Sequence, residues 1–364
     1  MNFPHIHLAA LLALCWHVGS AGALERTNLT FKIFQFPPNM IPRIDGKTDD
    51  WDIVPPGYAI GADQLVDDTG KHPSPDPKTL DAKVKVGWVK GLNRLYFLYE
   101  AYDDYWDFAL PGLHNDTFEL VVDGDLSGGP LIEKFHPAKG IIDPWEAYFS
   151  FQGVHAQNYH IFTPAEGKDW TMVWGPAQWI KELPYANAAY NYTFKPGESG
   201  KLVLEFWITP FDYAGHEGPQ RAVESILRED KIIGLSWAVI DYDDIKSGET
   251  NNGFWNLSRK HTMYGNASEL VAFRLMPLEP QFRKLIEAQW SFQVVDMNRR
   301  LVAFRDQSQG RINSWKWDFG DGETSTEQHP VHQYKSAGKF VVVLWVEGPE
   351  GASRRSKVWD VAVP

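Results

Sequence analysis

The alternation of apolar and polar residues over short segments is the feature that most limits the fold of this chain. In residues 83–89, Val84, Val86 and Trp88 lie on one face, while the lysines between them point the other way. A period of two is that of a half-buried β-strand. Turn-forming Gly, Pro, Asn and Asp separate many such segments, so the sequence predicts an all-β protein. Further strands are predicted at 95–103, 117–123, 146–151, 201–208, 232–240 and 269–275.

Helical periodicity occurs in only two segments. Residues 219–230 begin with a proline and continue with good helix formers, which predicts a helix inside a loop. Residues 279–290 follow a predicted strand, and we expect them to form a helical linker between two domains. The sequence therefore predicts a larger β-sandwich over 24–278 and a smaller, immunoglobulin-like sandwich over 291–364, where short strands follow one another closely.

An apolar run near the N-terminus predicts a secretion signal. The run around Cys15 has the length of a signal-peptide core and is too short to span a bilayer, and Ala21 to Ala23 fit a small-residue cleavage site. We interpret residues 1–23 as a removable signal peptide. Because Cys15 is the only cysteine, the mature chain would hold no disulfide and no thiolate metal site. We expect a secreted, extracellular protein without a transmembrane anchor, with the periplasm or the cell surface as alternatives.

Charge and composition exclude one class of partner and favour another. Lys and Arg total 35 against 47 Asp and Glu, which gives a formal net charge of -12. Affinity for phosphate depends on cationic side chains, so we expect no nucleic-acid partner. The chain holds 16 Trp, 14 Tyr and 21 Phe, which is more tryptophan than an ordinary core needs. Some of these rings are expected to contact a ligand.

A turn motif in the C-terminal region is the most specific pattern of the chain. The segment WDFGDG at 317–322 precedes a histidine-proline pair and a hydrophobic strand. Its glycines permit the left-handed backbone of a tight turn, and Asp321 can accept hydrogen bonds from amides of the turn. The region resembles a polycystic-kidney-disease (PKD) type domain, which implies a spacer that contacts an extracellular or cell-surface protein. The motif residues, to which the resemblance gives a structural role, are Trp317, Phe319, Gly320, Asp321, Gly322, Pro330, His332 and Tyr334.

Three segments of the larger region resemble a family 9 carbohydrate-binding module. They are RIDGKTDDW (43–51), NDTFELVVDGDLSGG (115–129), and the late pair WAVIDYDD (237–244) and GFWNLSR (253–259). The resemblance implies a jelly-roll or DOMON-like β-sandwich that holds a sugar between tryptophan rings and often binds Ca²⁺. It does not account for residues 130–200, where the chain carries long aromatic loops.

The acidic turn after residue 122 is a candidate Ca²⁺ site. Asp123, Asp125 and Ser127 stand at alternate positions before Gly128, as in the first half of a calcium loop. Calcium takes 6–8 oxygen ligands, so further oxygens would have to join these three. An ordinary turn between two strands is the alternative interpretation.

Two further acidic clusters occur in the larger region. Asp45, Asp49 and Asp50 form the second cluster, and the family resemblance implies a Ca²⁺ site there, with Asp45 and Asp50 as its candidate ligands. We interpret the third cluster, Asp241, Asp243 and Asp244, as a solvated turn.

Candidate sugar contacts are the tryptophans predicted to lie in or beside loops. A sugar needs flat apolar rings for its C–H faces and a few polar groups for its hydroxyls. We expect Trp106 and Trp174 to form a stacking pair, with Trp145 and Trp255 as further candidates. His114 stands where members of the family often carry an aromatic residue, and it completes the set of candidate contacts.

Taken together, these patterns predict a secreted, non-catalytic protein that binds a polysaccharide or an oligosaccharide. No G-x-S-x-G or H-E-x-x-H motif occurs in the sequence, and paired carboxylates such as Asp116 and Glu119 do not by themselves make a glycosidase. Three alternatives stay open. One is an accessory subunit of a polysaccharide-degrading system of O-glycosyl hydrolases, and another is an extracellular adhesion or scaffold protein. A haem-binding electron-transfer protein is a third alternative, which a Soret absorbance would reveal.

Overall fold

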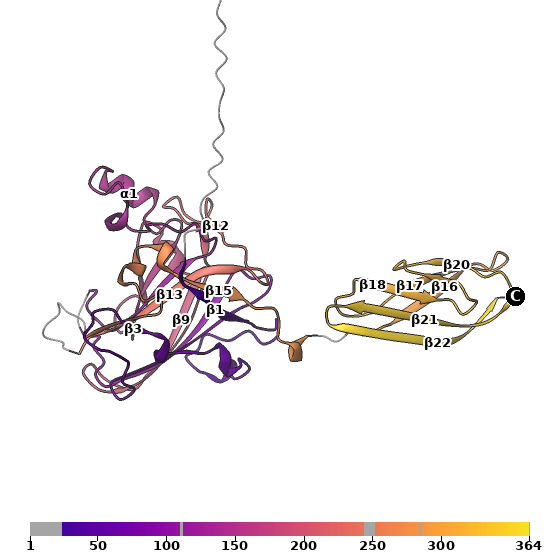
Figure 1. The fold of residues 1–364 in the computed structure, drawn as a ribbon, viewed down its shortest axis with the longest axis horizontal. Coiled ribbons are helices and arrows are strands. Elements are labelled where there is room, and N and C mark those ends of the chain that lie inside the picture. Colours follow the sequence, from indigo (N-terminus) through magenta and orange to yellow (C-terminus); the bar gives the residue numbers. More distant parts are fainter. Residues whose placement is uncertain (1–23, 110–111, 244–251, 284–285, 364) are drawn as a thin grey trace, which may run out of the picture. The chain divides into compact units, whose positions relative to one another are not determined.

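The computed structural model describes residues 24–109, 112–243, 252–283 and 286–363. The predicted signal peptide, residues 1–23, lies outside them. The chain divides into two compact units between Pro277 and Leu278. Figure 1 shows the course of the chain through each unit. Within the described residues, no helix has both the length and the apolar character needed to cross a lipid bilayer.

The larger unit is a β-sandwich whose first strand belongs to both layers. One layer has the order β8-β7-β6-β13-β15-β1, and the other has the order β1-β4-β5-β10-β9. Most of β1 runs parallel to β15, whereas its last residues, Phe34 and Gln35, pair with β4. The strands are β1 (Glu25–Gln35), β2 (Ile60–Gly61), β3 (Val66–Asp67), β4 (Leu80–Trp88), β5 (Leu95–Asp103), β6 (Thr117–Asp123), β7 (Gln157–Phe162), β8 (Thr171–Val173), β9 (Ala186–Asn191), β10 (Gly200–Ile208), β11 (Phe211–Tyr213), β12 (Val223–Glu224), β13 (Ile232–Asp241), β14 (Gly253–Asn256) and β15 (Val271–Leu275). The helices are α1 (Pro144–Ser150) and the short 3-10 helices η1 (Asp49–Trp51), η2 (Pro56–Tyr58), η3 (Ala62–Gln64), η4 (Glu133–Phe135), η5 (Gln178–Lys181), η6 (His261–Tyr264) and η7 (Ala267–Glu269).

The apolar faces of the two layers pack against each other. In β4, the residues that the alternation predicted to face inward are buried, Val84 and Val86 among them. Across the core, the ring of Phe118 on β6 lies 4.7 Å from that of Tyr99 on β5 and 6.2 Å from that of Phe206 on β10, centroid to centroid. These contacts confirm the predicted sandwich.

A second apolar cluster covers the outer face of β6 and β13. Val121 and Ala238 on these strands pack with Leu131, Met263 and Leu270 from the loops. Both faces of β6 and β13 are therefore buried, which explains why their sequences are nearly continuous apolar runs rather than alternating ones.

Two predicted elements of the larger unit are wrong. Residues 146–151, predicted as a strand, lie mostly in helix α1, because Asp143 caps the helix and Pro144 occupies its first turn. Residues 219–230, predicted as a helix, form turns and the short strand β12, whose backbone pairs with β11.

The predicted helical linker at 279–290 is also not a helix. Its described residues begin with the three-residue 3-10 helix η8 (Pro280–Phe282) and continue as extended chain. The backbone amide of Glu287 donates to Gln309 O over 3.0 Å, and that of Gln309 donates to Glu287 O over 2.9 Å. The backbone at Glu287 is therefore engaged in β-pairing within the smaller unit.

The smaller unit is a second sandwich, built from the sheets β16-β17-β20 and β19-β18-β21-β22. Its core contains Trp290, Phe304, Trp317 and Leu344, all almost fully buried. This confirms the all-β class with two sandwich domains. The strands are β16 (Trp290–Asp296), β17 (Leu301–Asp306), β18 (Ser314–Asp318), β19 (Thr324–Ser325), β20 (Val331–Gln333), β21 (Gly338–Gly348) and β22 (Gly351–Val363).

The WDFGDG turn is fixed by side chains from β20 and the residues after it. His332 stacks on Phe319 with centroids 4.1 Å apart, and its Nε2 lies 2.7 Å from a carboxylate oxygen of Asp321. The hydroxyl of Tyr334 donates to Phe319 O over 3.1 Å. The other oxygen of Asp321 accepts from the amide of Glu323 over 3.0 Å. These contacts give the motif a structural role.

The remaining motif residues support the same turn. Gly320 and Gly322 have φ values of 82° and 93°, which side chains disfavour. Trp317 is buried and donates from its indole nitrogen to Glu327 O over 2.9 Å, and Pro330 O accepts from the amide of Phe304 over 2.8 Å.

Candidate functional site

Helix α1 is held firmly against the larger unit by its inner face. A side-chain oxygen of Asp143 accepts from the amide of Trp145 over 2.9 Å and from the next amide along, so the first turn is capped. On the inner face, the hydroxyl of Tyr148 donates to Gly175 O, in the loop after β8, over 3.0 Å. The side chains on the outer face are therefore presented on a fixed support.

The outer face of α1 carries two exposed aromatic side chains, Trp145 and Phe149, which form an aromatic patch with His216 from the segment after β11. Trp145 is 70% exposed and Phe149 is 40% exposed. The two rings are one helical turn apart, with centroids 6.1 Å from each other and planes that differ by 19°. His216 approaches Phe149 with a centroid distance of 5.0 Å. The helix lies at the outer edge of the larger unit (Figure 1), and exposed aromatic groups of this kind mark contact surfaces.

Trp106 and Trp255 do not form a sugar platform, contrary to the sequence prediction. Trp106 is 1% exposed, stacks on Phe194 with centroids 4.8 Å apart, and donates to Gly200 O over 3.0 Å. Trp255 lies on β14, is 4% exposed and stacks on His72. Both rings are part of the packed interior, where a sugar has no access.

Trp174 and His114 are more exposed to solvent than Trp106 and Trp255. Trp174 is half-buried against the outer apolar cluster, and it precedes the Gly175 that receives the hydroxyl of Tyr148 from α1. The buried indole nitrogen of Trp174 has no hydrogen-bond partner among the described residues. His114 is exposed, with Nδ1 3.2 Å from the hydroxyl of Tyr242.

A group of buried aspartates, here called the carboxylate centre, lies at one end of the sandwich. It consists of Asp103 at the end of β5, Asp116 just before β6 and Asp241 at the end of β13, so it joins the two layers. One carboxylate oxygen from each lies within 4.8 Å of the others, and Asp104 and Asp243 form a second such group with Asp103. The aspartates predicted to be a solvated turn thus include the buried Asp241, and that interpretation is wrong for this residue.

Burial and mutual repulsion dominate the electrostatics of the carboxylate centre. Burial and the charge of Asp241 raise the pKa of Asp103 to about 9. Burial and the charge of Asp243 raise the pKa of Asp241 to about 7. Burial and the charge of Asp103 raise the pKa of Asp116 well above its usual value. Carboxylates in such a position need either protons or a cation to balance their charge.

The donor set of the carboxylate centre fits a hard divalent cation. Both oxygens of Asp116 accept backbone amides, from Asp107 over 2.5 Å and from Tyr242 over 2.8 Å, which fixes its orientation. Asp241 is 5% exposed, and its Oδ1 has no hydrogen-bond partner among the described residues. Carboxylate oxygens are the ligands that Ca²⁺ prefers. A bound Ca²⁺ would give the unpartnered oxygen a ligand and neutralise the repulsion.

The predicted calcium loop after β6 is organised as a turn. Asp123 accepts from the amides of Ser127 over 3.2 Å and Gly128 over 2.7 Å, and Asp125 accepts from the amide of Ser127 over 3.0 Å. The charges of Asp123 and Asp125 act on Lys231, which supplies a cation nearby. These backbone donors organise the turn, and Ca²⁺ binding by Asp123, Asp125 and Ser127 stays a prediction.

Asp45 and Asp50 do not converge on a common centre. Asp45 accepts from the amide of Lys47 over 3.1 Å, and Asp50 accepts from the amide of Arg43 over 2.8 Å. The loop instead surrounds a buried glutamate of β10, Glu205, whose Oε2 accepts the three successive amides of residues 45–47. The RIDGKTDDW segment is therefore an anchoring loop.

Asp103 and Asp116 are not among the metal ligands predicted from the sequence, although both stand at the ends of predicted strands. Asp103 ends the strand predicted at 95–103, Asp116 precedes the one at 117–123, and Asp241 follows the one at 232–240. The strand ends show where these aspartates stand along the chain, but only the pairing of the strands brings the three to the same end of the sandwich.

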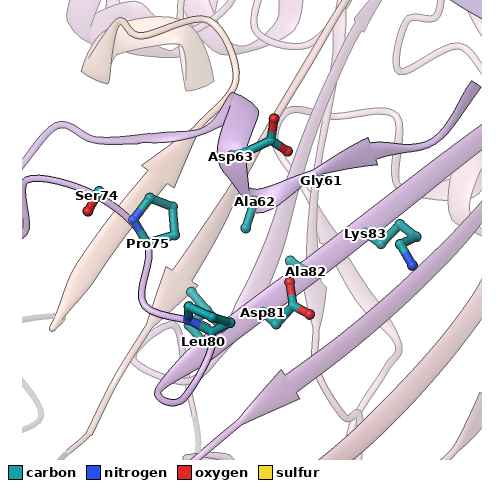
Figure 2. A pocket seen from close by; sticks show the side chains of 10 residues that line it. Gly61, Ala62, Asp63, Ser74, Pro75, Leu80, Asp81, Ala82 and Lys83 are labelled. Atoms are coloured by element: carbon teal, nitrogen blue, oxygen red, sulfur yellow. The ribbon is translucent and has the colours of Figure 1, made fainter. Parts of the chain in front are cut away.

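A cavity of about 570 Å³ lies beside β4 in the larger unit. Figure 2 shows Asp63 from η3, Pro75 from the loop before β4, and Asp81 and Lys83 from β4 around it. No aromatic ring lines it, so it lacks the flat apolar surface on which a sugar stacks.

Comparison with known proteins assigns the smaller unit first. Residues 296–363 match the family model described as PKD domain. Collagenase ColQ1 of Bacillus cereus is 48% identical over 48 residues, which cover 13% of this chain, and Microbial collagenase of Vibrio alginolyticus is 55% identical over 42 residues, which cover 12%. The chain spans about 5% of the length of these curated relatives.

Among solved structures, the larger unit is similar to a family 9 carbohydrate-binding module from Caldicellulosiruptor kristjanssonii in complex with cellotriose. The TM-score is 0.43 at 15% identity, over 69% of this chain and 95% of that one. The match to the PKD family model confirms the part of the predicted resemblance that concerns the C-terminal region.

Proposed function

We propose that the protein binds carbohydrate through the aromatic patch of α1, and that it acts as a non-catalytic, secreted binding protein. The observation that carries this proposal is the exposure of Trp145, at 70%, on a helix whose inner face is fixed to the domain. Its ring and the nearly parallel ring of Phe149 give a firm apolar surface of the kind that packs against the C–H face of a sugar. The sequence resemblance to a family 9 module agrees with this class of ligand.

A Ca²⁺ ion at the carboxylate centre is the second part of the proposal. Asp103, Asp116 and Asp241 would hold the ion, with Asp104 and Asp243 at its outer side. The ion would supply positive charge between the two layers. This charge would order the end of the sandwich where β5, β6 and β13 meet.

The sugar proposal is tested by removing the exposed ring. Calorimetric titration of the whole chain with cellotriose, the ligand named for the similar module, and with a panel of neutral oligosaccharides should show saturable binding. In Trp145→Ala we expect a loss of roughly tenfold or more, because a buried aromatic contact is worth a few kcal/mol.

The matched control is Leu183→Ala, which removes an apolar side chain of equal exposure, 71%, from another place on the surface. It should leave the affinity unchanged. Equal weakening by both substitutions, or no binding to any glycan by a folded chain, would sink the sugar proposal.

Protein contact through the PKD-type unit is a second candidate function. The β16-β17-β20 sheet carries three exposed apolar side chains, Val295 at 56%, Val331 at 58% and, just after β16, Met297 at 51%. Exposed apolar groups favour contact with another protein. An adhesion, scaffold or accessory role would rest on this surface. Replacing Val295 and Val331 by Ser should then abolish co-sedimentation with envelope fractions while glycan binding is retained.

A further inference from the structure

The first strand of the larger unit contains a wide bulge at its start. Glu25 pairs with Val271 of β15, and the next pair along β15 joins Thr30 to Ala272. Residues 26–29 therefore project from the sheet. Arg26, the first of them, has a φ of 55°, an unfavourable value for a residue with a side chain. Bulges and strained backbone of this kind concentrate at functional sites.

The bulge and a second strained arginine line an open cavity of about 370 Å³. Arg259, after β14, has a φ of 66° and lies on the wall of this cavity. The lining consists of Glu25, Arg26, Thr27, Asn28, Leu29 and Arg259. Two arginines thus contribute to the wall of one surface cavity in a chain whose net charge is -12.

Arg26 is held in place by neutral groups. Its Nη1 donates to the backbone oxygens of Gln64 over 3.3 Å and Leu257 over 3.2 Å, and its Nη2 donates to Gln64 Oε1 over 3.0 Å. Its guanidinium also lies 5.2 Å from the centre of the Phe31 ring. These contacts orient the guanidinium but leave its positive charge without a counter-charge.

No carboxylate of the described residues forms a salt bridge with either arginine. The nearest acidic side chain in the cavity wall, Glu25, lies 3.8 Å from the ammonium of Lys260. Burial and, after it, the charge of Arg259 lower the pKa of Arg26, as expected where two like charges share the wall of one cavity and therefore repel each other. An oxyanion between them would turn this repulsion into two charge-assisted contacts.

We propose that the cavity between Arg26 and Arg259 is an anion-binding subsite that takes the carboxylate or sulfate group of an acidic glycan. The subsite is open at the surface, so it admits a group that is attached to a chain. The exposed side chains of Thr27 and Asn28 offer hydrogen bonds to the hydroxyls around such a group. The glycan assignment rests on the proposed carbohydrate function, whereas the anion site rests on the arginine pair alone.

The test compares charged and uncharged forms of one oligosaccharide. The whole chain is titrated by calorimetry with trigalacturonate and with its methyl ester, which has the same sugar rings without the charge. We expect trigalacturonate to bind more tightly, and Arg259→Gln to weaken it by about tenfold to a hundredfold while leaving the ester unchanged. Arg259 is exposed, so the variant is expected to fold, which its unfolding midpoint checks.

The control is Arg228→Gln, which removes another exposed arginine from the same unit and should change neither affinity. Equal binding of acid and ester, or equal binding of acid by the wild-type chain and Arg259→Gln, would overturn the proposal. Binding of inorganic sulfate that Arg259→Gln abolishes, without binding of trigalacturonate, would overturn the glycan as the source of the anion. If cellotriose binding depends on Trp145 while trigalacturonate and its methyl ester bind equally well, the sugar function stands and this inference is overturned.

Discussion

At the scale of single residues, environment decides what a side chain does more than its type. Trp106 and Trp145 were both predicted to lie in or beside loops, yet the first is 1% exposed and the second is 70% exposed. The difference comes from Phe194, which is distant in sequence and stacks on Trp106. The sequence identified an excess of tryptophan, but it carried no information on which rings find such a partner.

Asp123 provides a residue-scale test of linkage between pH and stability. Burial and the neighbouring Asp125 raise its pKa to about 7, from an ordinary value near 3.8. Between about pH 4 and 7 the folded state therefore keeps a proton on Asp123 that the unfolded chain has released. The free energy of unfolding falls as the pH rises through this range. The slope from this one group is at most about 1.4 kcal/mol per pH unit.

Asp123→Asn cannot ionise, so it should remove this part of the slope. We expect urea unfolding between about pH 4 and 7 to show a shallower decline than that of the wild-type chain. The exposed Asp52→Asn should keep the wild-type slope. An unchanged slope in Asp123→Asn would show that this carboxyl is ionised in the folded state.

At the scale of elements, alternation predicted the strands well where only one face is buried. β4 and β10 lie where the period of two placed them. The segment 146–151 also alternates, but a capping aspartate and a proline just before it start a helix, and this local effect wins. The carboxylate centre was missed because its aspartates belong to different layers, and layer assignment depends on pairing that no single segment reveals.

The loop at 45–51 shows how one buried side chain holds an element in place. Glu205 on β10 accepts three backbone amides on Oε2 and the indole nitrogen of Trp51 on Oε1 over 2.8 Å. In Glu205→Gln an NH₂ group takes the place of one of the two side-chain oxygens. This NH₂ group, itself a donor, would then face either the three backbone amides or the Trp51 indole nitrogen, which are also donors. We expect a loss of about 1–3 kcal/mol in the free energy of unfolding, measured in urea. The exposed Glu166→Gln should lose nothing, and an equally stable Glu205→Gln would contradict the anchoring role.

At the scale of the whole molecule, the two units have separate hydrophobic cores. A ligand that binds one unit should therefore stabilise that unit and not the other. If Ca²⁺ binds the carboxylate centre, its addition should raise the thermal transition of the larger unit and leave that of the PKD-type unit in place. At a free Ca²⁺ concentration of about one hundred times the dissociation constant, binding raises the free energy of unfolding by about 2.7 kcal/mol.

Scanning calorimetry in Ca²⁺ and in chelator measures this shift. Asp241→Asn should reduce it, whereas Asp45→Asn should keep it, because Asp45 is bound to the Lys47 amide away from the centre. Identical scans with and without Ca²⁺ near neutral pH would rule out the ion at this site.

The pairing of β1 with β15 also sets the order of events during synthesis. The first strand of the larger unit finds its parallel partner only in the last strand, at Val271–Leu275. Until the ribosome has released that segment, the nascent chain has an open sheet edge and an unfinished core. Contacts so distant in sequence make folding slow, so this unit has to be kept from aggregating until its end has emerged. A chain truncated before β15 should therefore accumulate in aggregates rather than as a smaller folded product.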